Sequence, residues 1–197
     1  MNGAVRSLTA VIVAAGVLYA MQRSTPLYSD ITSPVPVAGR QGERVDTSAF
    51  AIGIAKVYLA RSITFPSLSR TQHYATSGVW VVVESAVEAK NESLGLTSAE
   101  WLGPDGLRYR YSQRLTNVPG MPGNEQFEPG IPRPMLMIFE VPESQIAGAR
   151  LLVARSPYAP LAEEAWIDMA ALSTDDIHPS ITLSRGGQQM PWILKVE

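Results

Sequence analysis

The two histidines of the sequence, His73 and His178, are the side chains best suited to bind a metal ion or transfer a proton. His178 closely follows Asp175 and Asp176, so one imidazole and two carboxylates could together form a metal site. Their spacing lacks the helical regularity of a motif such as HExxH, and this stretch is predicted to be a loop. A solvated loop is the better interpretation, and we expect no metal site.

Nucleophilic and acid–base chemistry have equally little support. The chain has no cysteine and no G-x-S-x-G turn, so neither a thiolate nor a serine elbow is indicated. Glu163 and Glu164, and likewise Glu140 and Glu143, are more simply explained as surface charges than as acid–base pairs. We therefore expect no catalytic residue, no cofactor and no enzyme activity.

Composition narrows the class of partner. The 197 residues suffice for one domain and a tail, and a net charge of −2 without a basic stripe argues against nucleic acid. Only 17% of the residues are charged while 46% are hydrophobic, and part of this apolar excess lies in the first turns of the chain.

The N-terminal segment is predicted to be a membrane anchor over residues 1–23. An uncharged run from Ser7 to Met21 lies between Arg6 and Arg23. We expect the anchor to contact the lipid bilayer through residues 4–21. As a helix, that run spans only about 22 Å, and its large apolar residues supply only about −2 to −4 kcal/mol of insertion energy. Insertion is predicted to be marginal, with the N-terminus in the cytoplasm.

A cleaved signal peptide is the competing interpretation of this segment. The shortness of the apolar run favours cleavage, whereas the sequence around Ala20 opposes it, because Leu18 stands where a small residue is needed. We favour a retained anchor. Small residues spaced by four would allow close helix packing, although alanine is also common in short anchors; they are Ala10, Ala14, Gly16 and Ala20.

Beyond the anchor, we predict a Pro- and Gly-containing linker over residues 24–46 and an extracytoplasmic β-sandwich over residues 47–197. Apolar residues alternate from Phe50 onward, and turn signals recur every 8–15 residues. The pattern is typical of an all-β, immunoglobulin-like antiparallel sandwich preceded by one transmembrane helix. The residues predicted to be buried are Phe50, Ile52, Trp80, Val82, Ile138, Val153 and Trp166.

The segment from Phe127 to Pro134 is a candidate docking loop. Its prolines would reduce the entropy lost on binding, and Phe127, Ile131 and Arg133 are residue types common at interfaces. Trp192, which follows a proline, is a further candidate for an exposed contact. The alternative is a well-packed loop of the sandwich.

Three elements resemble the DUF4352, or MPT63-like, family of exported bacterial β-sandwich domains. They are the strand and turn at 79–93, the hairpin at 102–109, and Pro129-Gly130 followed by the strand at 137–142. The resemblance covers roughly residues 50–169 and implies an exported immunoglobulin-like sandwich. It implies no catalytic residue, and the lipobox cysteine of many relatives is missing.

These observations lead to two hypotheses for function. The first is a non-catalytic subunit in the bacterial inner membrane, single-pass and with its domain in the periplasm, which docks on a larger membrane complex of respiratory, photosynthetic or secretion type. The alternative is a free-standing exported binding module for a small ligand or a component of the cell envelope.

Overall fold

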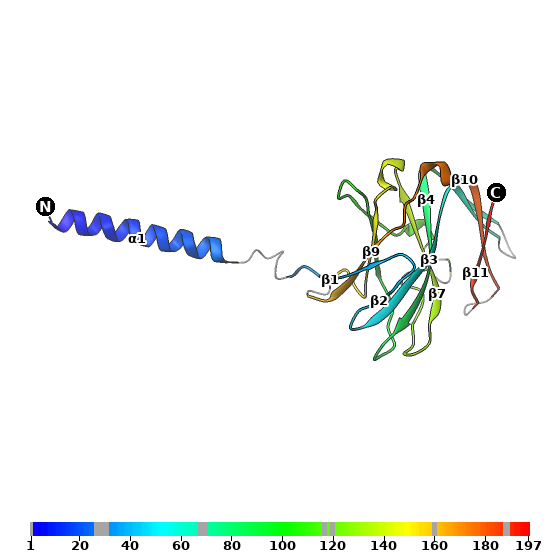
Figure 1. Cartoon of the computed structure of the whole chain (residues 1–197), viewed down its shortest axis with the longest axis horizontal. Coiled ribbons are helices and arrows are strands. Elements are labelled where there is room, and N and C mark those ends of the chain that lie inside the picture. The colour runs from blue at the N-terminus through cyan, green and yellow to red at the C-terminus, as the bar shows by residue number, and fades with distance from the viewer. Residues whose placement is uncertain are drawn as a thin grey trace. The chain divides into compact units, whose positions relative to one another are not determined.

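The computed structural model describes residues 2–25, 32–66, 71–115, 118, 121–158, 161–186 and 190–197. The chain divides into two units, Met1–Ser33 and Pro34–Glu197. The first holds helix α1 and the second holds every strand of the described residues (Figure 1).

Helix α1 runs over Asn2–Ser24. Its 23 residues extend for about 35 Å, enough for a hydrocarbon layer of about 30 Å. The uncharged run alone fell short of that length, but the helix also includes Arg6 and Arg23. The stretch Val5–Ser24 is long and apolar enough to cross a membrane, and none of it is buried in the described structure. The predicted N-terminal apolar helix is confirmed.

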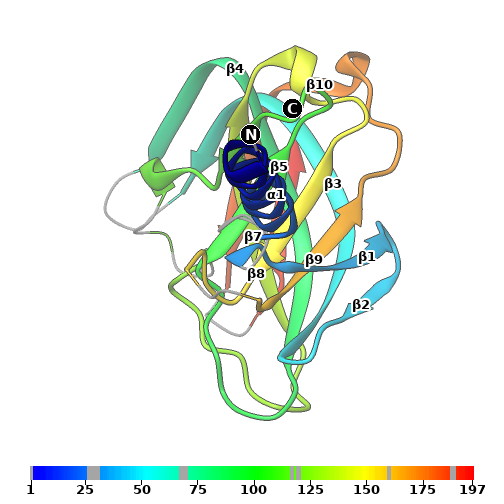
Figure 2. The same ribbon diagram turned by 90° about the vertical axis from the view of Figure 1, so that its left-hand side faces the viewer.

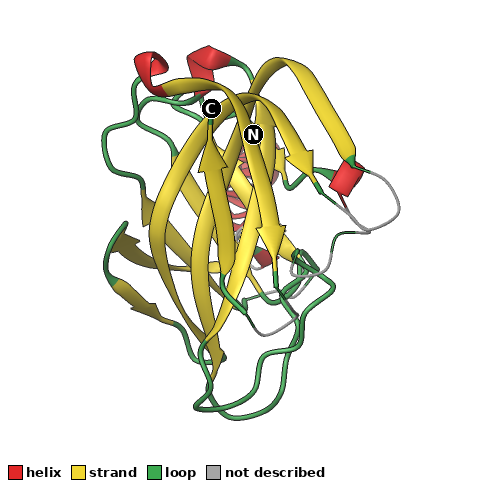
Figure 3. Ribbon diagram, turned by 90° about the vertical axis from the view of Figure 1, so that its right-hand side faces the viewer, coloured by secondary structure: helices red, strands yellow, loops and turns green. Residues whose placement is uncertain are grey.

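The second unit is a sandwich of two sheets, as predicted (Figures 1 and 3). Within the described residues, one sheet has five strands in the order β1-β9-β8-β5-β6. The other, six-stranded, has the order β11-β10-β3-β4-β7, with β2 also paired to β3. We call them sheet A and sheet B. The strands are β1 Val35–Arg40, β2 Arg44–Asp46, β3 Phe50–Phe65, β4 Gln72–Ala89, β5 Ser98–Leu102, β6 Arg108–Arg110, β7 Arg133–Val141, β8 Arg150–Ala154, β9 Glu163–Asp168, β10 Ile177–Arg185 and β11 Trp192–Val196.

Two strand pairs differ from the predicted antiparallel arrangement. Strand β1 lies parallel to β9 in sheet A (Figure 2). Strand β10 lies parallel to β3 in sheet B. Parallel neighbours need a long connection between them, and in both pairs most of the domain separates the partners in sequence. Local alternation and turn signals carry no information about such distant pairings.

The predicted linker at 24–46 is too long, because its second half belongs to the sandwich. Residues 35–40 form the edge strand β1 on β9, and residues 44–46 form β2 on β3. Both strands are short and have few large apolar residues, so period-two alternation is weak there. Of the predicted linker, residues 26–31 lie outside the described residues.

From Val79 to Val83, strand β4 is buried on both faces, which explains its continuous apolar run. Val79, Val81 and Val83 face the main core between the sheets, whereas Trp80 and Val82 face a second core on the outer side of sheet B. Of the residues predicted to be buried, all except Trp166 are buried. That ring is partly exposed because the inward positions of β9 are Ala165 and Ile167.

The second core is closed by segments that lack strand periodicity. Leu115, in the 3-10 helix Gln113–Leu115, and Met121 pack there with Trp192 of β11. A buried ion pair joins β10 to the loop that contains Met121. Arg185 donates from Nη1 to Glu125 at 2.9 Å, and its guanidinium lies 5.4 Å from the centroid of the Trp192 ring. The long loop predicted after Val118 is therefore the cover of a core.

Candidate functional site

The structure buries two of the residues predicted to contact a partner. Phe127 is 1% exposed and belongs to the main core, where its backbone pairs with Leu94. Trp192 is 7% exposed and belongs to the second core. The exposure expected for Trp192 is thus wrong, and neither ring is available on the surface. Phe127 lies in a loop segment that folds over the main core, and Trp192 begins β11, a strand of sheet B, from which its ring packs into the second core.

The other two domain residues of that prediction remain accessible to different degrees. Ile131 is 52% exposed at the turn beside Gly130. Arg133 begins β7, is partly buried and donates from Nη1 to the Gln126 carbonyl at 3.4 Å. Of the predicted docking loop, only the tip around Ile131 offers an apolar side chain to a partner.

The four small residues of α1 lie on its exposed surface. At about 100° per residue, Ala10 and Ala14 share one stripe of the helix, and Gly16 and Ala20 share a second. The two stripes lie about 120° apart around the helix. A Cβ added at Gly16 would meet no atom within 4 Å outside the helix backbone.

The histidines are not brought together. His73 on β4 pairs with Thr64 of β3, while His178 on β10 pairs with Ala60 of the same strand. Four strand residues separate these positions by about 13 Å. No group of three metal-binding side chains occurs within the described part of the chain.

The carboxylates Glu140 and Glu143 lie beside an open depression of about 420 Å³, but both have arginine partners. Arg114 contacts Glu140 at 3.3 Å, and Arg61 contacts Glu143 and donates to the Gly78 carbonyl at 2.9 Å. The depression is also lined by Thr76, Ser77, Gly78, Val141 and Pro142. Its volume would suit a small ligand, but both of its carboxylates are already paired with arginines.

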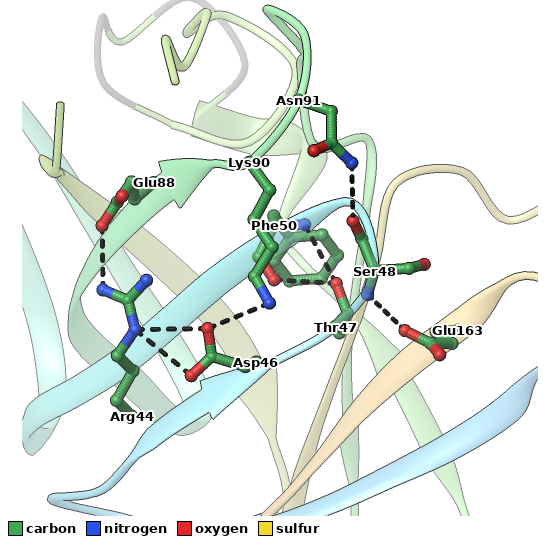
Figure 4. Close-up of polar contacts among 9 residues, drawn as sticks. All are labelled: Arg44, Asp46, Thr47, Ser48, Phe50, Glu88, Lys90, Asn91 and Glu163. Carbon is green, nitrogen blue, oxygen red and sulfur yellow. Dashed lines mark hydrogen bonds and ion pairs between the residues drawn. The ribbon is translucent and has the colours of Figure 1, made fainter. Parts of the chain in front are cut away.

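A charged network at the surface joins β2 to the end of β4, the two strands that pair with β3 on either side (Figure 4). Arg44 lies between Glu88, at 2.8 Å, and Asp46, at 3.2 Å, and Lys90 also reaches Asp46 at 3.1 Å. The hydrogen bonds from Lys90 and Arg44 hold the pKa of Asp46 below its usual range. Two cations face two carboxylates, so this network fixes the strands and offers no unbalanced charge.

Beside this network, Ser48 connects the turn before β3 to strand β9 and to the loop after β4. Its backbone N–H donates to the Glu163 carboxylate of β9, and its carbonyl accepts from Asn91 (Figure 4). Thr47 closes the turn by exchanging hydrogen bonds with Phe50. Glu163, one of the carboxylates considered for catalysis, thus links the two sheets.

The outer face of sheet A carries a buried carboxylate. Glu164 of β9 accepts a 2.7 Å hydrogen bond from Trp166, over which Arg150 lies at 5.3 Å from the ring centroid. Burial raises the pKa of Glu164, and nearby Glu100 adds to the rise, while the Trp166 hydrogen bond and Arg108 oppose it.

The exposed apolar side chains between β8 and β9 were not predicted from the sequence. Tyr158 is 83% exposed and Leu161 is 60% exposed, and they lie on the loop that leads into β9. The sequence signal was a tyrosine and a leucine set among prolines, in Ser156-Pro157-Tyr158 and Pro160-Leu161.

No protein-family model matches the sequence, and no curated protein matches it. Several solved structures are nevertheless similar. The yjhA protein of Bacillus subtilis is 9% identical, with 67% of this chain and 99% of that one covered and a TM-score of 0.50. An uncharacterised β-sandwich protein of Clostridium difficile is 14% identical (74% and 100% covered, TM-score 0.48). The secreted protein MPT63 of Mycobacterium tuberculosis is 12% identical (68% and 98% covered, TM-score 0.48).

At these identities the similarity concerns the fold alone. Because no family model matches, membership of the DUF4352 family stays a prediction.

The raised pKa of Glu164 predicts a pH-dependent loss of stability. The folded state favours the protonated acid, and this preference stabilises it. The stabilisation is fully present below the ordinary glutamate pKa of about 4.3 and is lost as the pH rises through the raised pKa of Glu164. Glu164→Gln retains an acceptor for Trp166 and cannot ionise. The melting temperature of the wild type should therefore fall relative to that of the variant as the pH rises from 4 to 8. Parallel curves would show that Glu164 titrates normally.

Proposed function

We propose that this protein is a non-catalytic, membrane-anchored interaction subunit. Helix α1 crosses the bacterial inner membrane once with its N-terminus in the cytoplasm. The sandwich lies in the periplasm, and the protein docks on a larger complex of integral-membrane proteins.

The observation that carries this proposal is α1 itself. Its side chains from Val5 to Ser24 are apolar over a membrane-spanning length and are not covered by the rest of the described chain. Such a surface requires a lipid or protein environment. At the end of the helix, Arg23 donates to the Tyr19 hydroxyl at 3.2 Å and lies over its ring. Tyrosine and arginine at a helix end are typical of a membrane–water interface.

One face of α1 is suited to a second helix. Gly3, Ser7, Ala10 and Ala14 follow one another at spacings of four, three and four, which places them on one side of the helix. Small residues in such a row allow two backbones to approach closely inside a membrane. A single-pass anchor needs no such face to hold the sandwich at the membrane, whereas a subunit of a complex does.

The sandwich supports a role in interaction more than one in catalysis. The carboxylates Glu140, Glu143 and Glu163 are each engaged with an arginine or a backbone amide. Carboxylates held by such contacts suit fixed structure better than proton transfer.

A matched pair of variants tests docking. Ala14→Leu fills the small-residue face, whereas Ala15→Leu makes the same change about 100° away on the helix. Overpacking the contact should weaken association by about 1–3 kcal/mol, while both variants insert at least as well as the wild type. Partner subunits that co-purify in mild detergent should therefore be lost from Ala14→Leu and kept by Ala15→Leu. Equal recovery from both would place the contact elsewhere.

A binding module for a small ligand is the second candidate, and the depression beside Glu140 and Glu143 favours it. The same purification separates the two. A subunit migrates with other membrane proteins, whereas a free-standing module migrates as a lone chain.

A further inference from the structure

We infer that the β8–β9 loop, through Tyr158 and Leu161, lies on the lipid surface of the membrane and sets the orientation of the sandwich. This inference rests on the proposed anchoring by α1. It adds a second contact, made by the folded domain itself with the interface between lipid headgroups and acyl chains.

The first observation is the position of the loop. The sandwich begins at Pro34, and the next residue, Val35, donates its backbone N–H to the Ala162 carbonyl at 2.9 Å. Leu161 is adjacent to Ala162, so the chain enters the domain directly beside this loop. Val35 is itself exposed. Leu161 therefore lies beside the point where the tether arrives, and Tyr158 belongs to the same connection between β8 and β9.

The second observation is the short reach of that tether. The described part of the anchor ends at Thr25, and residues 26–33 connect it to Pro34. Fully extended, that connection spans at most about 30 Å, whatever its conformation. An inserted α1 thus keeps the first residue of the sandwich, and the loop beside it, close to the membrane surface.

The third observation is the strained presentation of Leu161. Among the described residues it is the only non-glycine with a positive φ, at 56°. A leucine in the left-handed region carries a cost that glycine would avoid, and here no burial offsets it, because the side chain is exposed. Strain kept at an exposed apolar residue points to a contact made outside the chain.

Residues around the loop suit an interface with water and lipid headgroups. Tyrosine prefers this depth in membranes because its ring is apolar and its hydroxyl is polar. Arg155 at the start of the loop and Arg110 beside Pro157 are exposed cations, although each also has a carboxylate partner, Glu92 and Glu100 respectively. The apolar side chains therefore supply most of the contact, and the arginines add a weaker attraction to anionic lipids.

The absence of cysteine makes a direct test possible, since an introduced cysteine is the only thiol in the chain. Tyr158→Cys and Leu161→Cys would each be labelled with a nitroxide in the full chain, reconstituted in vesicles of phosphatidylethanolamine and phosphatidylglycerol. Leu107→Cys is the matched control. It is also exposed, at 53%, and lies beyond the opposite end of β5 from Ser98, which pairs with Ala154 at the start of the loop. Val13→Cys reports on the anchor.

The quantity measured is the ratio of nitroxide collisions with oxygen to collisions with a water-soluble nickel chelate. We expect this ratio to be several-fold higher at positions 158 and 161 than at position 107. Position 13 should give the highest ratio. If 158 and 161 match 107 while 13 remains deep, the anchor stands and the loop contact is overturned. If position 13 is also accessible to nickel, the anchoring and the loop contact both fail. Unchanged tryptophan fluorescence verifies that each labelled domain is folded.

Discussion

Replacing Glu125 by Ala is expected to lower the free energy of unfolding by about 3–5 kcal/mol, because the change leaves the buried Arg185 guanidinium without its counter-charge. The two side chains are 10% and 7% exposed. Arg185 also donates to the Met190 carbonyl at 2.8 Å and lies over Trp192, so it cannot move into water without opening the second core.

Chemical denaturation followed by tryptophan fluorescence would measure this loss. All four tryptophans lie in the sandwich and none in α1, so the full chain in mild detergent is a suitable sample. Asp168→Ala is the control: its ion pair with Arg150 is exposed, and its loss should cost less than about 1 kcal/mol. Replacing Glu125 and Arg185 together by Met should cost less than Glu125→Ala alone. Equal, small effects for Glu125 and Asp168 would mean that the buried pair is solvated.

The strands with strong alternation were predictable from local pattern. The apolar alternation predicted from Phe50 onward coincides with the first residue of β3, and the predicted strand and turn at 79–93 include the second half of β4. Strands β1 and β2 were missed because an edge strand needs few buried side chains, so its sequence resembles a linker.

The surface was less predictable than the core. Phe127 and Trp192 were predicted to face a partner because prolines surround them, but prolines occur equally in segments that cover a core. A residue's exposure in a loop depends on where the loop folds back, which is a tertiary property. Conversely, a tyrosine and a leucine set among prolines at positions 158 and 161 gained significance only once the structure paired the neighbouring Ala162 with Val35, at the start of β1.

Introducing arginine at both Val13 and Val17 is expected to abolish membrane insertion. Each arginine near the helix centre costs about 2.5–3.5 kcal/mol, whereas the large apolar residues of α1 together supply only about 2–4 kcal/mol. The chain should move from the membrane pellet to the supernatant after carbonate extraction. Gln22→Arg, near the end of α1, should leave it in the pellet, because a terminal arginine reaches the headgroups. Retention of the double variant would show that something other than α1 holds the chain at the membrane.

Whether α1 is kept as an anchor is tested most directly by the intact mass of the chain extracted from the membrane. The account predicts a carbonate-resistant protein of 21.3 kDa, with α1 still attached to the sandwich. A soluble chain shortened by the residues of α1 would contradict it, since the helix would then be a cleaved signal and the sandwich a secreted domain.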